Sequence, residues 1–101
     1  MDAVELCRIF NEGGYVEKAE RGELRMIVKK SRISAWTHIR NWMPGTESQE
    51  LEFRDADDNV VAKGHRFLRP DGKLAASGMI DPKRVYSQGK WYGLRSPDPA
   101  A

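Results

Sequence analysis

The sequence predicts an α+β fold, in which one small domain packs an N-terminal helix on a mainly antiparallel sheet of about four or five strands. Three observations support this fold. Apolar residues recur at helical spacing near the N-terminus, later segments alternate apolar and polar residues, and clusters of Gly, Pro, Asp and Asn separate those segments. The 101 residues suffice for one domain, which we expect over residues 1–95, and the proline-containing end 96–101 predicts a disordered tail.

The N-terminal segment carries the clearest helix signals. Asp2 precedes the apolar pattern and Glu5 follows three residues later, which is the spacing of a capping box. Leu6 and Phe10 lie four residues apart and therefore share one side of a helix. These signals predict a helix over residues 2–12.

The next segments predict a second, shorter helix and a first strand. Gly13-Gly14 ends the first helix, and residues 16–21 predict a short helix that stops at Gly22. Over residues 24–30 apolar and charged residues alternate, with Ile27 as the exception, and this alternation predicts a strand.

Residues 33–43 leave helix and strand open. Four apolar residues have the spacing of a helix face: Ile33, Trp36, Ile39 and Met43. Pro44-Gly45 would stop such a helix. Tryptophan and threonine in the same segment favour a strand instead, so the pattern favours a helix only slightly.

The C-terminal half predicts β-hairpins. Residues 50–54 and 60–68 are extended in pattern on either side of the turn-forming segment 55–59. Residues 85–92 predict a terminal hairpin whose turn contains Gln88 and Gly89.

Between these hairpins we expect two turns that enclose a short strand. Residues 69–73 read Arg-Pro-Asp-Gly-Lys, which suits a type I turn, and Asp81-Pro82 starts another. Residues 74–80 predict a short strand of mostly small residues.

Composition narrows the class of protein. Cys7 is the only cysteine, which excludes an intrachain disulfide and a cysteine-based zinc site. No apolar run approaches the ~18 residues of a membrane span. The first 23 residues carry six acids against three bases, unlike a secretory or transit peptide. We therefore expect a cytoplasmic protein without membrane contact, cofactor or metal site.

Charge is arranged in blocks, although the net charge is only +2. Residues 2–23 carry −3, residues 24–46 carry +5, residues 47–58 carry −5 and residues 59–95 carry +6. Either neighbouring elements pair acidic with basic blocks, or the two basic blocks form one face for a polyanion. The first arrangement is the more common one, and the sequence does not decide between them.

The basic, turn-rich segment 69–84 is the candidate binding surface. Its glycines lack the spacing of GxxxxGK[ST] or GxGxxG, so a nucleotide cradle is not indicated. Cations beside aromatic side chains are typical of single-stranded nucleic-acid sites, although tryptophans in a small domain more often belong to the core. The predicted binding residues are Arg69, Lys73, Lys83, Arg84, Lys90 and Trp91.

Catalytic candidates are few. His65 or His38, beside concentrated positive charge, would suit a metal-independent hydrolase or a ribonuclease-like toxin, with Asp71 as an acid–base partner of His65. The alternative interpretation of each histidine is a structural one.

A resemblance rests on three stretches: His65-Arg66-Phe67-Leu68-Arg69-Pro70-Asp71-Gly72, then Ala76-Ser77-Gly78, then Asp81-Pro82-Lys83. They resemble short uncharacterised bacterial proteins, some of which travel on mobile elements such as phages or gene cassettes. The resemblance covers residues 50–95 and implies a bacterial cytoplasmic accessory protein. It brings no activity, cofactor or catalytic residue.

These observations predict a non-enzymatic binding module. Its partner is either nucleic acid, on the basic surface of residues 69–90, or a protein, at an exposed strand edge. A second copy of the chain could use the same edge to form a homodimer. The competing hypotheses are the histidine-dependent hydrolase and a small-molecule binder with an aromatic-lined cavity.

Overall fold

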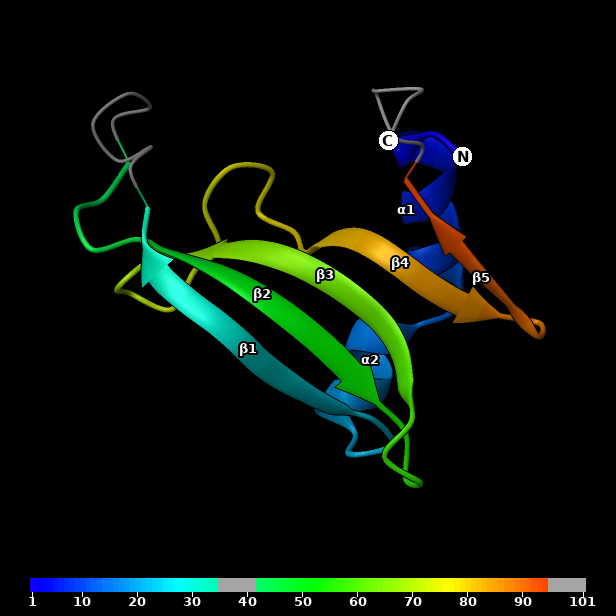
Figure 1. Cartoon of the computed structure of the whole chain (residues 1–101). Coiled ribbons are helices and arrows are strands. Elements are labelled where there is room, and N and C mark those ends of the chain that lie inside the picture. Colours follow the sequence, from blue (N-terminus) through cyan, green and yellow to red (C-terminus); the bar gives the residue numbers. More distant parts are fainter. Residues whose placement is uncertain (35–41, 95–101) are drawn as a thin grey trace.

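Two helices and one antiparallel sheet form the protein, as a computed structural model that describes residues 1–34 and 42–94 shows (Figure 1). The elements are α1 (Ala3–Glu12), α2 (Tyr15–Glu20), β1 (Arg25–Ile33), β2 (Glu47–Arg54), β3 (Val60–Leu68), β4 (Asp81–Ser87) and β5 (Lys90–Gly93). The five strands lie in the order β1-β2-β3-β4-β5, so each pairs with its neighbour in sequence. The predicted α+β fold is confirmed.

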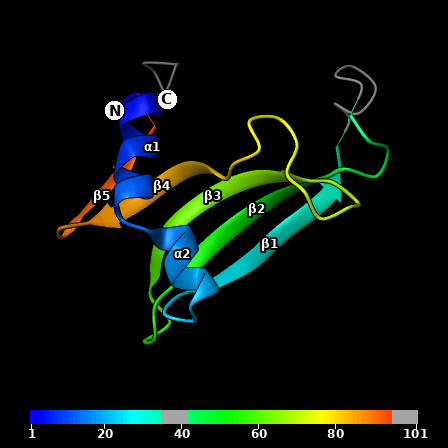
Figure 2. The same ribbon diagram turned by 180° about the vertical axis from the view of Figure 1, so that it is seen from behind.

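The sheet has a helix-bearing face and a helix-free face. Figure 1 views the helix-free face and Figure 2 the opposite one, where both helices lie in front of the strands. Leu51, Phe53, Ala62 and Val85 point to the helix-bearing face, and each is at most 2% exposed. Because side chains alternate along a strand, their neighbours in sequence point to the helix-free face.

The core joins the two helices to the middle of the sheet. Leu6 and Phe10 of α1 and Tyr15 of α2 pack against the buried residues of the strands. The ring of Phe10 stacks on Tyr15 at 5.4 Å and meets Phe53 edge-on at 5.6 Å. The hydroxyl of Tyr15 donates a hydrogen bond to the carbonyl of Tyr86 at 2.7 Å, which ties α2 to β4.

The first helix begins and ends as its sequence signals predict, and the second lies one residue earlier than the predicted 16–21. The carboxylate of Asp2 accepts a hydrogen bond from the backbone N–H of Glu5 at 2.8 Å. Gly13 caps the end of α1, and Gly14 takes a left-handed conformation with φ of 64° before α2 begins. Each feature satisfies the free backbone groups at a helix end.

The segment after α2 runs further as a strand than predicted. β1 continues to Ile33, three residues beyond the predicted end at Lys30. The pattern of residues 33–43 slightly favoured a helix, and this prediction is wrong at Ile33, which lies in β1. Trp42 and Met43 have no regular structure. The rest of that prediction, with His38, lies outside the described residues, as does the predicted tail over 96–101.

Both predicted hairpins are confirmed. In the turn between β2 and β3, the carboxylate of Asp55 accepts hydrogen bonds from the N–H groups of Asp57 and Asn59, each at 2.9 Å. The turn between β4 and β5 places Gln88 and Gly89 at φ of 52° and 78°. Positive φ at both central residues is typical of the type I′ turn, whose twist matches that of the strands it connects.

The segment between β3 and β4 differs from its prediction. The turn over residues 69–73 is confirmed, since the N–H of Arg69 bonds the carbonyl of Lys73 at 2.8 Å. Residues 74–80 are not a strand, because Ala76 and Gly78 have φ of 60° and 76°, which interrupts extended backbone. One isolated bridge, Leu68 to Leu74, is the sheet pairing that this segment makes.

Asp81-Pro82 begins β4, and the prediction of a turn there is wrong. Pro82 lies opposite Gly64 at an irregularity in the β3–β4 pairing, where a strand tolerates a missing N–H. A Cβ on Gly64 would come within 3.2 Å of the carbonyl oxygen of Asp81. Glycine at this position therefore lets the start of β4 approach β3 closely.

Candidate nucleic-acid interface

The helix-free face carries basic side chains from β1, β3 and β4. The strand register places Glu50 and Glu52 of β2 on this face, with Lys30 beside Glu50 and Lys63 beside Glu52. His65 and Asp81 continue the row across β3 and β4. Apart from the Arg25–Arg54 pair at one end of the sheet, the cations of the face are Lys29, Lys30, Arg32, Lys63, Lys83 and Arg84.

Two β-bulges add cations to this face. The pairing of β1 with β2 shifts between Val28 and Lys30, which leaves Lys29 as the extra residue. The pairing of β3 with β4 shifts between Lys63 and Gly64, which leaves Lys83 as the extra residue. Lys29 and Lys83 both line one hollow of about 390 Å³ on the helix-free side, together with Lys63. Each bulge therefore re-aims a lysine toward the same surface.

Lys63 and Arg84 form a like-charge pair across neighbouring strands. They are direct register partners, and directly opposed like charges destabilise a sheet. Neither residue forms an ion pair with an acid in residues 1–34 or 42–94, and the same holds for Lys83. Three cations thus share one region of the surface without a bonded counter-ion.

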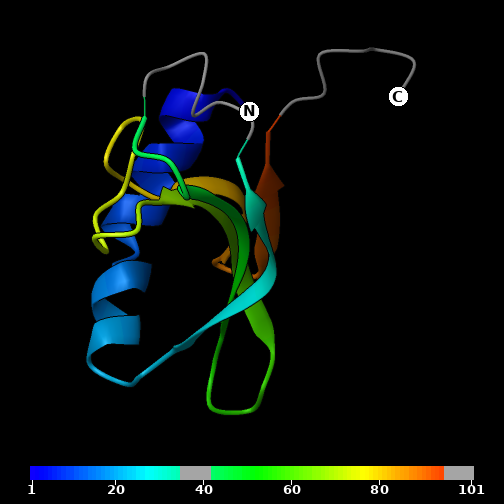
Figure 3. The same ribbon diagram turned by 90° about the vertical axis from the view of Figure 1, so that its left-hand side faces the viewer.

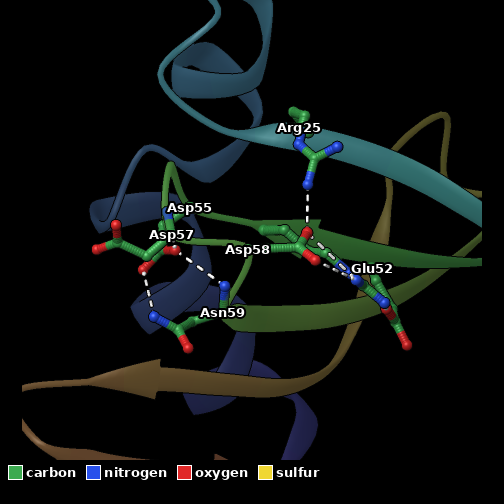
Figure 4. A network of polar contacts seen from close by, with 7 residues as sticks. Arg25, Glu52, Asp55, Asp57, Asp58 and Asn59 are labelled. Carbon is green, nitrogen blue, oxygen red and sulfur yellow. Dashed lines mark hydrogen bonds and ion pairs between the residues drawn. The ribbon is translucent and has the colours of Figure 1, made fainter.

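A second like-charge pair in the same sheet is neutralised. Arg25 and Arg54 are also direct register partners. Asp58 forms ion pairs with both, at 3.2 Å to Arg54 and in direct contact with Arg25 (Figure 4). Asp58 reaches this position from a left-handed conformation with φ of 65°. Asp58 therefore neutralises one end of the sheet, whereas Lys63 and Arg84 have no ion-paired acid among the described residues.

An acidic row along β2 separates the cations of β1 from those of β3 and β4. Glu52 bonds Arg54 at 2.8 and 3.1 Å, and this hydrogen bonding lowers the pKa of Glu52, with smaller effects from the charges of Lys29 and Lys63. Part of each basic block of the sequence lies on this face, and two residues of the acidic block, Glu50 and Glu52, lie between those parts. Both arrangements that the sequence left open are therefore present in part.

An exposed aromatic pair adjoins the Lys63–Arg84 region. The rings of Tyr86 and Trp91 lie 5.5 Å apart, and the side chains are 41% and 42% exposed. The guanidinium of Arg84 lies over the ring of Trp91 at 5.2 Å. The two residues are register partners on β4 and β5, one position from the buried Val85, so they point to the helix-free side. Trp91 is therefore a surface residue and not part of the core.

The predicted binding residues divide between two places. Lys83, Arg84 and Trp91 meet on the helix-free face. Lys90 lies two residues from Tyr92, so it points to the other side of β5 at the hairpin end. Arg69 and Lys73 lie in the turn after β3, which bends to the helix-bearing side (Figure 3).

Asp71 has a local role in the turn after β3. Its carboxylate forms an ion pair with Arg69 at 2.7 Å and accepts a hydrogen bond from the N–H of Lys73 at 3.0 Å. Both contacts stabilise the turn itself. No contact of the described chain joins Asp71 to His65.

His65 lies in the middle of the helix-free face. Its Nε2 is 2.7 Å from the hydroxyl oxygen of Ser48, and its ring meets Phe67 edge-on at 4.6 Å. Burial lowers the pKa of His65, and the ammonium of Lys83 lowers it further, while the carboxylates of Asp81 and Glu50 act in the opposite direction. The ring is therefore held in place and is neutral at neutral pH.

The sequence pattern did not find Lys29, Lys30, Lys63, Ser48 and Tyr86. Alternation identifies which residues share a face, but the two bulges that bring Lys29 and Lys83 to that face depend on strand pairing. The segment 69–84 drew attention to one basic stretch, whereas the surface joins three strands.

A hollow of about 610 Å³ lies beside the turn after β3, with one aromatic residue, Trp42, in its lining next to Leu74 and Arg69. Trp42 packs on Phe67 at 4.8 Å. The Nε of Arg69 is buried and has no hydrogen-bond partner in the described part of the chain. This hollow is where the predicted small-molecule binder would place its ligand, and that function stays a prediction.

The edge strand β1 has features that discourage pairing with a second chain. It contains a bulge and the adjacent lysines 29 and 30, and natural edge strands use both devices against association. The other edge, β5, is only four residues long. The homodimer through a sheet edge stays a prediction, and neither edge favours it.

Within residues 1–34 and 42–94, no group of three or more His, Cys, Asp or Glu side chains is placed to hold a metal ion. Neither helix in those ranges has the length and apolar character needed to cross a membrane.

The fold and face together define a small α+β protein whose five-stranded meander is open on one side. No family model matches the chain, and neither the curated proteins nor the solved structures contain a significant match to it.

Proposed function

We propose that this protein binds single-stranded nucleic acid on the half of the helix-free face formed by β3, β4 and β5. The observation that carries the proposal is the cluster of Lys63, Lys83 and Arg84 without a bonded acid, next to the exposed rings of Tyr86 and Trp91. An arrangement that destabilises the free protein is expected where a ligand supplies the missing charge.

The cations and the aromatic rings of this surface each match one part of a single-stranded nucleic acid. Phosphates would supply the counter-ions for Lys63, Lys83 and Arg84. The guanidinium of Arg84 can also donate two hydrogen bonds to the oxygens of one phosphate. Unpaired bases expose flat faces that stack on aromatic rings, and each stacked base contributes ~1–3 kcal/mol. Bases in a duplex already stack on one another, so the exposed Trp91 ring favours a single strand over a duplex.

The acidic row of β2 restricts where the phosphates can lie. Glu50 and Glu52 would repel a backbone that ran along the whole of β2, so the strand is expected to follow β3 and β4 and to approach β2 only beside the uncharged Ser48. The same carboxylates keep the total affinity moderate, which agrees with the net charge of +2.

Fluorescence anisotropy with labelled random-sequence RNA and DNA of about 20 nucleotides tests the proposal. Binding should weaken from about 50 to about 200 mM salt, with a slope of about −2 in a plot of log affinity against log salt if three cations meet phosphates. Trp91→Ala should weaken binding about 5- to 150-fold, the equivalent of one lost stacking contact.

Lys18→Ala is the matched control, since Lys18 is an exposed cation of α2 on the helix-bearing side. It removes the same charge as Lys63→Ala and should leave the affinity nearly unchanged. Absence of binding at the lowest salt, or equal losses in the Lys18 and Lys63 variants, would reject the proposal.

A further inference from the structure

A second group of reactive side chains lies on the helix-free face, beside the proposed binding surface. Ser48, Glu50 and His65 from β2 and β3 line a hollow of about 350 Å³ with Lys30 and Arg32 from β1. This hollow adjoins the one that contains Lys63 and Lys83, because Glu50 and His65 line both. A strand bound along β3 and β4 would therefore pass directly beside His65.

The sheet register brings these side chains together. Glu50 lies directly opposite His65 on β3 and opposite Lys30 on β1, and Arg32 lies opposite Ser48. Directly opposed residues on one face have Cβ atoms ~4.5–5.5 Å apart. An imidazole, a carboxylate and two cations thus surround a space that can take one phosphodiester with its sugar.

His65 is positioned by its neighbours. Ser48 bonds its Nε2 at 2.7 Å, and Phe67 packs against the ring at 4.6 Å. A ring that is fixed in this way can meet a substrate proton in one geometry, which is a requirement for general-base catalysis.

We propose that this cluster cleaves RNA by transesterification without a metal ion, with His65 as the general base, Arg32 holding the phosphoryl oxygens and Lys30 facing the leaving oxygen. This activity rests on the proposed function, because the binding surface delivers the strand to His65. RNA is the substrate class, since DNA lacks the 2′-hydroxyl that attacks.

The chemical step balances within the substrate and these side chains. The unprotonated ring nitrogen of His65 takes the proton of the 2′-hydroxyl, and the 2′-oxygen forms a bond to phosphorus. The bond from phosphorus to the 5′-oxygen breaks, and the departing oxygen takes a proton from the ammonium of Lys30. The products are a 2′,3′-cyclic phosphate and a 5′-hydroxyl, and no oxidant or reductant is required.

The charges around His65 suit this role. Arg32 and Lys30 approach from β1, Glu50 from β2, and Asp81 and Lys83 from β4. The guanidinium of Arg32 can meet two equatorial oxygens of the phosphorane, where negative charge develops. The lowered pKa of His65 keeps the ring unprotonated at neutral pH, as a base must be.

Ser48 is a positioning residue and not a nucleophile. β2 is an inner strand whose backbone amides pair with both neighbours, so it leaves no free N–H group for the oxyanion of an acyl intermediate. The hydroxyl of Ser48 orients the ring of His65, and Ser48→Ala should alter the pH profile of cleavage more than the affinity for RNA.

The test uses the full chain with a random-sequence RNA of about 20 nucleotides, a DNA of matched sequence and an RNA with 2′-O-methyl groups. Cleavage in the presence of EDTA should occur on RNA alone and leave a 2′,3′-cyclic phosphate. The rate should fall as pH falls through the lowered pKa of His65. His65→Ala should lower the rate about 100- to 10,000-fold.

Arg32→Ala is a second variant that cannot be dismissed as misfolded, because Arg32 is exposed on an edge strand. It should lower the rate at least about tenfold, and Arg32→Lys should restore part of it. Lys18→Ala, purified identically, should keep the full rate, whereas a contaminating ribonuclease would cleave equally in every preparation, including that of His65→Ala.

Failure of this proposal can be told apart from failure of the proposed function. If the protein binds RNA but leaves it intact, or if His65→Ala cleaves as fast as the unaltered protein, the cleavage proposal is wrong and the binding function stands. If neither binding nor cleavage occurs, both are wrong.

Discussion

Lys83→Gln is the substitution that most clearly separates a binding role from a structural one. Lys83 is the extra residue of the β3–β4 bulge, is exposed, and has no ion pair in the described chain. It lies beside the like-charge pair Lys63 and Arg84. Gln is polar and uncharged, and its side chain is only one atom shorter than that of Lys, so the main change is the loss of the charge.

The expected effects on stability and binding have opposite signs. Cross-strand charge pairs contribute ~0.2–1 kcal/mol, and a bulged, exposed lysine falls at the low end, so the free energy of unfolding should rise by about 0.3 kcal/mol. In a chain of this size that corresponds to about 1–2 °C in melting temperature. The loss of one phosphate contact should reduce the slope of log affinity against log salt by about 0.7.

Urea unfolding at low salt and anisotropy titrations with RNA measure the two effects. The pKa of His65 should also rise in this variant, because the Lys83 ammonium lowers it in the unaltered protein. NMR titration of the ring protons measures this, with His65→Gln to assign one of the two histidines. Destabilisation by more than about 1 kcal/mol would show that Lys83 has a structural role, and unchanged affinity for RNA would show that it does not meet a phosphate.

Three further predictions concern the fold and its dependence on pH. Asp58→Ala leaves Arg25 and Arg54 opposed without a counter-ion, so the urea midpoint should fall at low salt and recover partly at high salt; an equal loss at both salts would contradict a charge effect. Phe53→Ala removes a fully buried ring and should cost about 3–5 kcal/mol, measured by urea unfolding; a loss below about 1 kcal/mol would place Phe53 outside the core. The pKa of His65 is lower in the folded chain than in the unfolded one, so its contribution to stability is present above about pH 6.5 and is lost as pH falls through the folded pKa. His65→Gln should flatten this part of the curve of unfolding free energy against pH, and an unchanged curve would show that another group is responsible.

Local signals were sufficient for most elements of the fold. Asp2 and the glycines at 13 and 14 bound α1, and Gln88-Gly89 forms the last hairpin turn, because caps and turns depend on residues close in sequence. The prediction of a strand over residues 74–80 was wrong, because a run of small residues does not reveal the positive φ of Ala76. Only the folded loop imposes that conformation.

The surface was less predictable than the fold. The bulges at Lys29 and Lys83 and the partnership of Lys63 with Arg84 depend on which residues of neighbouring strands face each other. One-residue changes of register decide the face of every side chain, and sequence alone does not set them. His65, one of the two histidines that the sequence offered as candidates, lies in that surface, but its contact with Ser48 joins two strands and could not be predicted.

The most direct test of the central claim is to record amide chemical shifts while adding a short single-stranded RNA to the labelled protein. We expect changes at Lys63, Lys83 and Arg84 and at the indole N–H of Trp91, all on the helix-free face. Changes confined to α1, α2 or the turn of residues 69–73 would contradict the central claim, because that pattern would place the ligand on the opposite side of the sheet.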